Sequence, residues 1–67
     1  MMSQPVQSVR LSNEELATVR EAMRELNRLL AQLERGELEK VVVAQRNQMR
    51  AVLITVERYS ELEQRAA

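Results

Sequence analysis

The chain of 67 residues contains no cysteine, no histidine and no aspartate, and Tyr59 is its only aromatic residue. Without cysteine and histidine it cannot form disulfides or the common zinc sites, and the usual nucleophile and base combinations of enzymes are missing. We therefore expect no enzymatic activity, no metal, no cofactor and no small-molecule substrate. A chain this short forms one small domain over residues 1–67 with a marginal core.

Long apolar runs and an excess of charge of one sign are also missing. No stretch approaches the ~18 apolar residues of a membrane span, and the N-terminus lacks a signal-peptide pattern. These two absences favour a cytoplasmic protein without a membrane partner. Ten lysine and arginine residues balance ten glutamates, which gives a net charge of zero. This balance argues against a generally cationic nucleic-acid binder but is compatible with a local basic patch.

The N-terminal part of the chain indicates a short strand that leads into a helix. Residues 1–5 are expected to form a flexible lead-in, and the loose alternation over residues 6–11 indicates an edge strand. Ser12 and Glu15 then have the spacing of a capping box, in which each side chain satisfies a backbone N–H at a helix start.

The next segment has the apolar spacing of one long helix over residues 13–35, because apolar residues recur every three or four positions. Gly36 is the only glycine and stands where a left-handed helix cap is expected. A helix of this length measures about 35 Å, whereas strands of ~6 residues span only about 20 Å. The helix should overhang its sheet, and we expect the same helix of a second copy to cover the excess in a homodimer. The stripe assigned to this core and dimer contact consists of Leu16, Val19, Met23, Leu26, Leu30 and Leu33.

The C-terminal part indicates a hairpin and a second helix. Two β-branched runs, at 41–44 and 51–56, flank a polar connection with a turn at Asn47. Both runs are apolar without alternation, which predicts that both faces of the hairpin are covered. A helix over 57–65 follows, with Tyr59 and Leu62 as inward anchors and 64–67 as a short tail. The expected fold is α+β, in the order β-α-β-β-α, with one long helix on a small antiparallel sheet. Two residues of the second run are assigned to the core or dimer contact, Val52 and Ile54.

Three cations gather around the hairpin. Lys40, Arg46 and Arg50 lie in a segment that contains no glutamate between residues 40 and 56. Arginine binds phosphates and guanine edges, and amide side chains bind base edges or the backbone. These residues predict a DNA-binding turn, whereas the alternative is a polar turn that is simply solvated. The full candidate set is Arg10, Lys40, Gln45, Arg46, Asn47 and Arg50. A second group, Arg20, Arg24 and Arg28, is interpreted as a salt-bridged exposed face because Glu21 and Glu25 alternate with it.

Residues 40–63, which read KVVVAQRNQMRAVLITVERYSELE, resemble a segment of the prevent-host-death/YefM (Phd/YefM) family of antitoxins. Members of this family have an aliphatic strand, a short basic turn, an Ala-Val-Leu strand, a Ser or Thr, and a helix with Tyr shortly before Leu. In this sequence the matching positions are 41–43, 51–53, Thr55, Glu57, Tyr59 and Leu62. The resemblance implies a small dimeric α+β fold that binds operator DNA, represses its own toxin–antitoxin operon and neutralises a partner toxin.

Three features favour an alternative function on the same dimeric scaffold. The family's turn carries Arg followed by Gly, whereas this chain has no glycine in residues 45–48. The net charge is zero, and the expected tail at 64–67 is short. The predicted helix is also longer than is usual in the family. The alternative is a protein–protein interaction module that does not bind DNA and whose partner is a toxin, a phage protein or a host protein.

Overall fold

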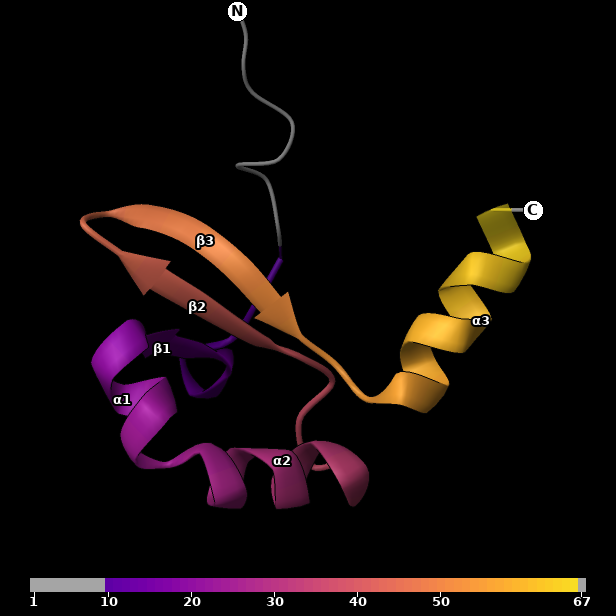
Figure 1. The fold of residues 1–67 in the computed structure, drawn as a ribbon, viewed down its shortest axis with the longest axis horizontal. Helices are drawn as coiled ribbons and strands as arrows, with labels where there is room; N and C mark the ends of the chain where they lie inside the picture. The colour runs from indigo at the N-terminus through magenta and orange to yellow at the C-terminus, as the bar shows by residue number, and fades with distance from the viewer. Residues whose placement is uncertain (1–9, 67) are drawn as a thin grey trace, which may run out of the picture.

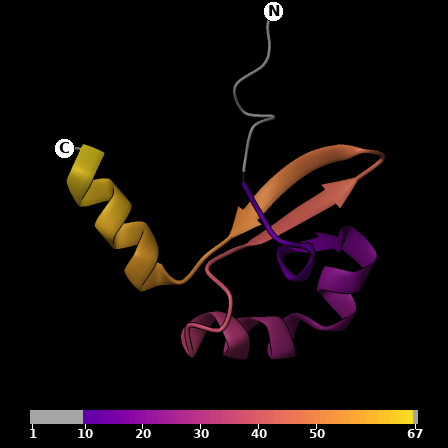
Figure 2. The ribbon, with the colours of Figure 1, turned by 180° about the vertical axis from the view of Figure 1, so that it is seen from behind.

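The computed structural model describes residues 10–66 and confirms the α+β class. Its three-stranded sheet has the order β1-β2-β3, in which β1 (Leu16–Thr18) pairs parallel to β2 (Val41–Gln45), and β2 pairs antiparallel to β3 (Gln48–Leu53). The helices are α1 (Val19–Arg24), α2 (Leu26–Glu34) and α3 (Val56–Ala66). Figures 1 and 2 show α1 and α2 together on one side of the sheet and α3 projecting from the end of β3. The sheet is therefore mixed, and the prediction of an antiparallel sheet was wrong for β1.

The first strand lies inside the segment that was predicted to be helical. The predicted strand at 6–11 falls mostly outside the described residues, and its last two residues have no regular structure. The capping interaction at Ser12 is confirmed, because its N–H donates to Oε1 of Glu15 at 3.0 Å, but it begins only a 3-10 turn over Asn13–Glu15. The three residues of β1 follow directly and adopt an extended backbone because they pair with β2.

A second capping box, which the sequence analysis missed, begins α1. Oγ1 of Thr18 accepts a hydrogen bond from the N–H of Glu21 at 3.0 Å. In return, Oε1 of Glu21 accepts the N–H of Thr18 at 2.9 Å. Two free backbone donors at the helix start are satisfied in this way, and the chain changes from strand to helix within one residue.

The predicted continuous helix over 13–35 is wrong, because the chain breaks at Glu25 (φ −114°, ψ 24°) between α1 and α2. Figure 1 shows that the two helices run in different directions. Two short helices that run in different directions can both cover a small sheet, whereas one straight helix of the same length would extend beyond it. The break also changes which apolar residues face the core. Ala22, Leu29 and Leu33 are buried.

Most of the predicted apolar stripe is consequently outside the core. Leu33 is its only buried member and Val19 is half-buried. The side chains of Met23, Leu26 and Leu30 are exposed, and Leu16 is exposed on β1. Because the predicted helix is not continuous, its overhang cannot be the reason for a dimer.

The helix end at Gly36 is confirmed. Gly36 has φ +79°, its N–H donates to the carbonyl of Leu33 at 3.1 Å, and the N–H of Glu37 donates to the carbonyl of Gln32 at 2.9 Å. This pair of bonds is a Schellman motif, which requires a left-handed residue after the helix. The chain then turns back toward the sheet, and Leu38 enters the core.

A connection of only two residues joins the strands of the hairpin. Arg46 and Asn47 form it, with φ +54° and +64°, as a type I′ turn requires. The predicted turn at Asn47 is confirmed. The second strand begins at Gln48, earlier than predicted, and the register shifts by one residue so that Arg50 lies in a β-bulge.

The last helix does not pack inward as predicted. Oγ1 of Thr55 accepts the N–H of Arg58 at 3.0 Å, so Thr55 begins α3 and does not extend the strand. No residue of α3 is buried, and Tyr59 is 56% exposed and Leu62 40% exposed. The predicted inward anchors are therefore wrong for the single chain. Residues 64–66 belong to the helix and not to a tail.

The core lies between the sheet and the helices α1 and α2. The buried cluster consists of Ala17, Ala22, Leu29, Leu33, Leu38 and Val41, with Val43 and Leu53 packed against it. The prediction that both faces of the hairpin are covered is wrong within one chain, because β3 is exposed along nearly all of its length. Of the two residues assigned to core or dimer contact in this region, Val52 is exposed and Ile54 is half-buried.

Candidate nucleic-acid interface

Four of the predicted DNA-binding residues lie together at the tip of the β2–β3 hairpin. Arg46 and Asn47 form the turn itself and are exposed. Gln45 and Arg50 flank the turn, and Nη1 of Arg50 donates to Oε1 of Gln45 at 2.7 Å. This bond fixes one guanidinium beside the tip. These four predicted residues therefore present two cations and two amides within one short segment.

Lys40 lies at the opposite end of β2 and does not belong to this group. The five residues of β2 separate it from the turn, a distance of about 17 Å at the rise of a strand. Its Nζ lies 3.4 Å from Oε1 of Glu15 and 3.6 Å from Oε1 of Glu39, and its side chain is only 18% exposed. Arg10 is exposed before the 3-10 turn and lines neither of the clefts beside the hairpin tip. The structure therefore separates two of the six predicted residues from the rest.

Two arginines of α1 lie beside the hairpin tip, and the sequence analysis did not assign them to the site. Because α1 follows β1, and β1 pairs with β2, the start of α1 is placed next to the end of β2. One cleft of about 410 Å³ is lined by Arg20 together with Arg46 and Asn47. A second cleft of about 550 Å³ is lined by Arg20, Arg24 and Gln45.

No carboxylate lines either cleft among residues 10–66. Arg24 has one acidic contact, since its Nη2 lies 3.4 Å from Oε2 of Glu25. In the described part of the chain, Arg20 and Arg46 form no ion pair within 4.0 Å, the distance at which such pairs are counted. These two guanidinium groups are therefore available to an anion from outside the chain.

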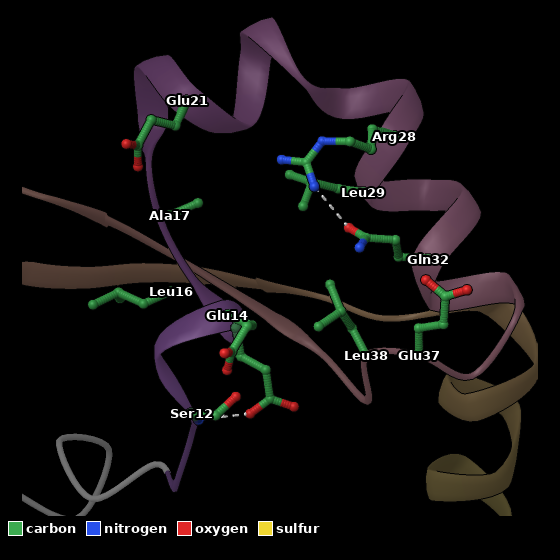
Figure 3. Close-up of a pocket in the computed structure, with 11 residues that line it drawn as sticks. Ser12, Glu14, Leu16, Ala17, Glu21, Arg28, Leu29, Gln32, Glu37 and Leu38 are labelled. Atoms are coloured by element: carbon green, nitrogen blue, oxygen red, sulfur yellow. Dashed lines mark hydrogen bonds between the residues drawn. The ribbon is translucent and has the colours of Figure 1, made fainter.

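The glutamate next to Arg20 in the sequence has its carboxylate on another side of α1. Glu21 accepts the N–H of Thr18, and this hydrogen bond lowers the pKa of the Glu21 carboxyl. Its side chain lines a separate groove of about 480 Å³, shown in Figure 3, together with Glu14 and Glu37. The basic clefts and the acidic groove are thus separate surfaces of one small domain.

Arg28 and Arg35, by contrast, are occupied by internal partners. Nε of Arg35 donates to Oε2 of Glu37 at 2.7 Å, which lowers the pKa of the Glu37 carboxyl. Arg28 donates to Oε1 of Gln32 at 3.1 Å and to the carboxylate of Glu25. The interpretation of a salt-bridged face is therefore confirmed for Arg28, with Arg24 also contacting Glu25. The interpretation was wrong for Arg20, which forms no ion pair in the described part of the chain.

The arrangement of the clefts suits a phosphate backbone. A guanidinium donates several hydrogen bonds in a fixed plane and keeps its charge at all physiological pH values. Arg20, Arg24 and Arg46 border a concave surface, and the amides of Gln45 and Asn47 lie at its rim. Amides of this kind bind base edges or backbone oxygens.

Comparison with known proteins returns no relative: no family model, no curated protein and no solved structure matches the chain. Within residues 10–66, no helix combines the length and the apolar character needed to cross a membrane. The same residues contain no group of three or more side chains arranged to hold a metal ion.

Proposed function

We propose that this protein is a cytoplasmic DNA-binding repressor of the antitoxin type, which binds operator DNA through the hairpin tip and the start of α1. The observation that carries the proposal is a pair of adjoining clefts without a carboxylate in their lining: Arg20 lines both clefts, Arg46 lines one and Arg24 lines the other. Phosphate oxygens would bind the guanidinium groups, and Gln45 and Asn47 would face the groove between the phosphates. Affinity would then depend mainly on the neutralisation of phosphates and fall with salt.

One difference from the Phd/YefM antitoxins that the sequence predicted is not found in the structure. The sequence predicted a helix longer than the family's, and the structure divides that segment into β1, α1 and α2. The excess helix length therefore no longer distinguishes the chain from the family. Neutralisation of a toxin enters the proposal through the resemblance alone.

A fluorescence-anisotropy titration against the protein's own upstream DNA at two salt concentrations tests the proposal. We expect the wild type to prefer this DNA over a scrambled duplex. The Arg20→Ala/Arg46→Ala double variant should bind at least tenfold more weakly, and its salt slope should fall by about 2, since each lost phosphate contact removes about 0.9. Both side chains are exposed, so the circular dichroism spectrum should not change.

The matched control is the Arg28→Ala/Arg35→Ala double variant, which removes the same charge from α2 and the residue that follows it. Both of these arginines are held by internal partners, and neither lines the clefts beside the hairpin. The control should retain the wild-type affinity within about twofold if the site is local. An equal loss of affinity in both double variants would contradict a site at the hairpin and indicate that only net charge matters.

The alternative function is a protein–protein interaction module that does not bind DNA. The acidic groove of Figure 3 favours it, because Glu14, Glu21 and Glu37 on the same small domain repel a polyanion. If the wild type does not bind its upstream DNA at micromolar concentration and low salt, the repressor proposal is wrong and this alternative replaces it.

A further inference from the structure

The helix α1 carries two rows of side chains beside the hairpin. The apolar row consists of Val19 and Met23, and the basic row consists of Arg20 and Arg24. In both rows the two residues are four positions apart, so they are neighbours on one side of the helix. All four side chains line the cleft of about 550 Å³ that Gln45 also lines. An apolar row and a basic row therefore border the same concave surface.

The apolar row is left largely outside the core. Met23 is 74% exposed, whereas Ala22 next to it is buried and Val19 is half-buried. A single exposed apolar side chain on a protein surface needs no explanation. Met23, however, shares a cleft with two guanidinium groups. Its thioether is therefore available to an apolar group of the same ligand that the arginines bind.

The adjoining cleft of about 410 Å³ continues this arrangement toward the hairpin. Val19 lines it as well, together with Ala44 of β2, and both residues are half-buried. Arg20 and Arg46 line the same cleft and are exposed. Apolar side chains thus lie deeper in the surface and guanidinium groups lie nearer to its rim. A matching ligand must carry negative charge and an apolar group close together.

Double-stranded DNA carries both kinds of group side by side. Its strands carry a negative phosphate at each nucleotide, and thymine places a C5 methyl group in the major groove, the only methyl group among the base edges there. That groove is about 12 Å wide and admits a helix or a two-stranded ribbon. In Figures 1 and 2, α1 and the hairpin turn lie toward the same end of the molecule, so both can approach one stretch of the groove.

We propose that α1 reads thymine, with Met23 and Val19 contacting the C5 methyl group while Arg20 and Arg24 bind nearby phosphates. This inference rests on the proposed function and adds a base preference, which phosphate contacts alone do not supply. Methionine suits the contact because its unbranched side chain adapts to the shape of its partner. Gln45 lines the same cleft, and amide side chains bind adenine, the base that pairs with thymine. The cleft therefore favours an A·T base pair.

Deoxyuridine tests the methyl contact directly, because it pairs as thymidine does and lacks only the C5 methyl group. Anisotropy titrations compare the protein's own upstream duplex with the same duplex in which uracil replaces every thymine. The wild type should bind the uracil duplex about fourfold more weakly for each methyl group contacted, which is the usual effect of burying one methyl-sized group. The salt slope should be the same for both duplexes, because the phosphate contacts are unchanged.

Three variants assign this preference to a residue. Met23→Ala should bind the two duplexes with nearly equal affinity and keep its fold, because the side chain is exposed and alanine favours helices. Met23→Leu keeps an apolar side chain of similar size and should retain the preference. The matched control is Leu26→Ala on α2, which lines neither cleft and should retain the preference in full. An effect of uracil on DNA shape would be common to all variants, so the difference between variants isolates the contact.

The possible failures of this experiment have different meanings. Equal affinity of the wild type for both duplexes would overturn the inference and leave the proposed function in place. A preference for thymine that survives Met23→Ala would assign the methyl contact to another residue and would also overturn the inference. If the wild type binds neither duplex, the proposed function is wrong and the inference is lost with it.

Discussion

The chain divides into a packed half and a peripheral half with similar apolar content and very different burial. All of the buried residues belong to β1, α1, α2, β2 or the segment that joins α2 to β2, whereas β3 and α3 contribute none. The run 51–54 is as apolar as the run 41–44, yet only the latter contains fully buried residues. For these two runs, burial follows the place in the sheet, because β2 is the central strand and β3 lies at an edge.

The largest expected effect lies inside the packed half. Leu29→Ala should lower the free energy of unfolding by about 2–5 kcal/mol, because it removes a buried side chain and leaves a cavity. Leu30→Ala, on the neighbouring outward position, should cost less than about 1 kcal/mol. Urea denaturation at one protein concentration measures both. Equal losses would contradict the break at Glu25, since a continuous helix with the predicted stripe would bury Leu30 instead.

The next effect concerns the end of α2. Gly36→Ala should lower stability by about 1 kcal/mol, because an alanine is strained at φ +79° while its Cβ would meet nothing within 4 Å. Gly36→Asn should cost less, since asparagine tolerates the left-handed region. Thermal unfolding of the two variants distinguishes backbone strain from crowding. A larger cost for asparagine would contradict the backbone explanation.

A smaller effect concerns the peripheral half. Tyr59 is the only aromatic residue, so its fluorescence reports on α3 alone. We expect iodide to quench Tyr59 in the folded chain nearly as strongly as in the urea-unfolded chain, because the Tyr59 side chain is 56% exposed and no residue of α3 is buried. Strong protection of Tyr59 from iodide in the folded chain would contradict an exposed α3.

The smallest effect is a dependence on pH within the packed half. The pKa of the Glu15 carboxyl is lowered, first by the N–H of Ser12 and further by Lys40. A carboxyl whose pKa is lower in the folded state stabilises the fold above its unfolded pKa and loses this contribution as pH falls through the folded value. Glu15→Gln should therefore lower the midpoint of thermal unfolding at pH 7 and have less effect at pH 3. Glu63→Gln on α3, where the structure shows no such contact, should leave both midpoints unchanged.

Local signals in the sequence were sufficient for several elements. The hairpin, its turn at Asn47, the cap at Gly36 and the bond between Ser12 and Glu15 each depend on residues close together in the chain. The strand β1 could not be predicted, because its three residues are extended only through pairing with β2, which is distant in sequence. The break at Glu25 was hidden because the apolar spacing continues through it without interruption.

Only part of the candidate interface could be predicted from the sequence, because only that part depends on residues close together in the chain. Arg46, Asn47 and their neighbours were grouped correctly because one hairpin holds them. Arg20 joins them only through the parallel pairing of β1 with β2, which no local pattern reveals. Lys40 was assigned wrongly to the site because a residue only six positions before the turn lies a whole strand away from it. Its contact with Glu15 could not be predicted locally, because the two residues are 25 positions apart in the chain.

The shortness of α1, which has six residues, has a consequence for the stability of the basic clefts. A helix of this length does not form alone in water, so the start of α1 exists only while the sheet beside it exists. Arg20 and Arg46 come from these two separate elements, and a partly unfolded chain would keep neither in place. The basic clefts are therefore present only in the fully folded molecule. If the proposed repressor function holds, occupancy of DNA would follow the folding equilibrium and the rate of proteolysis.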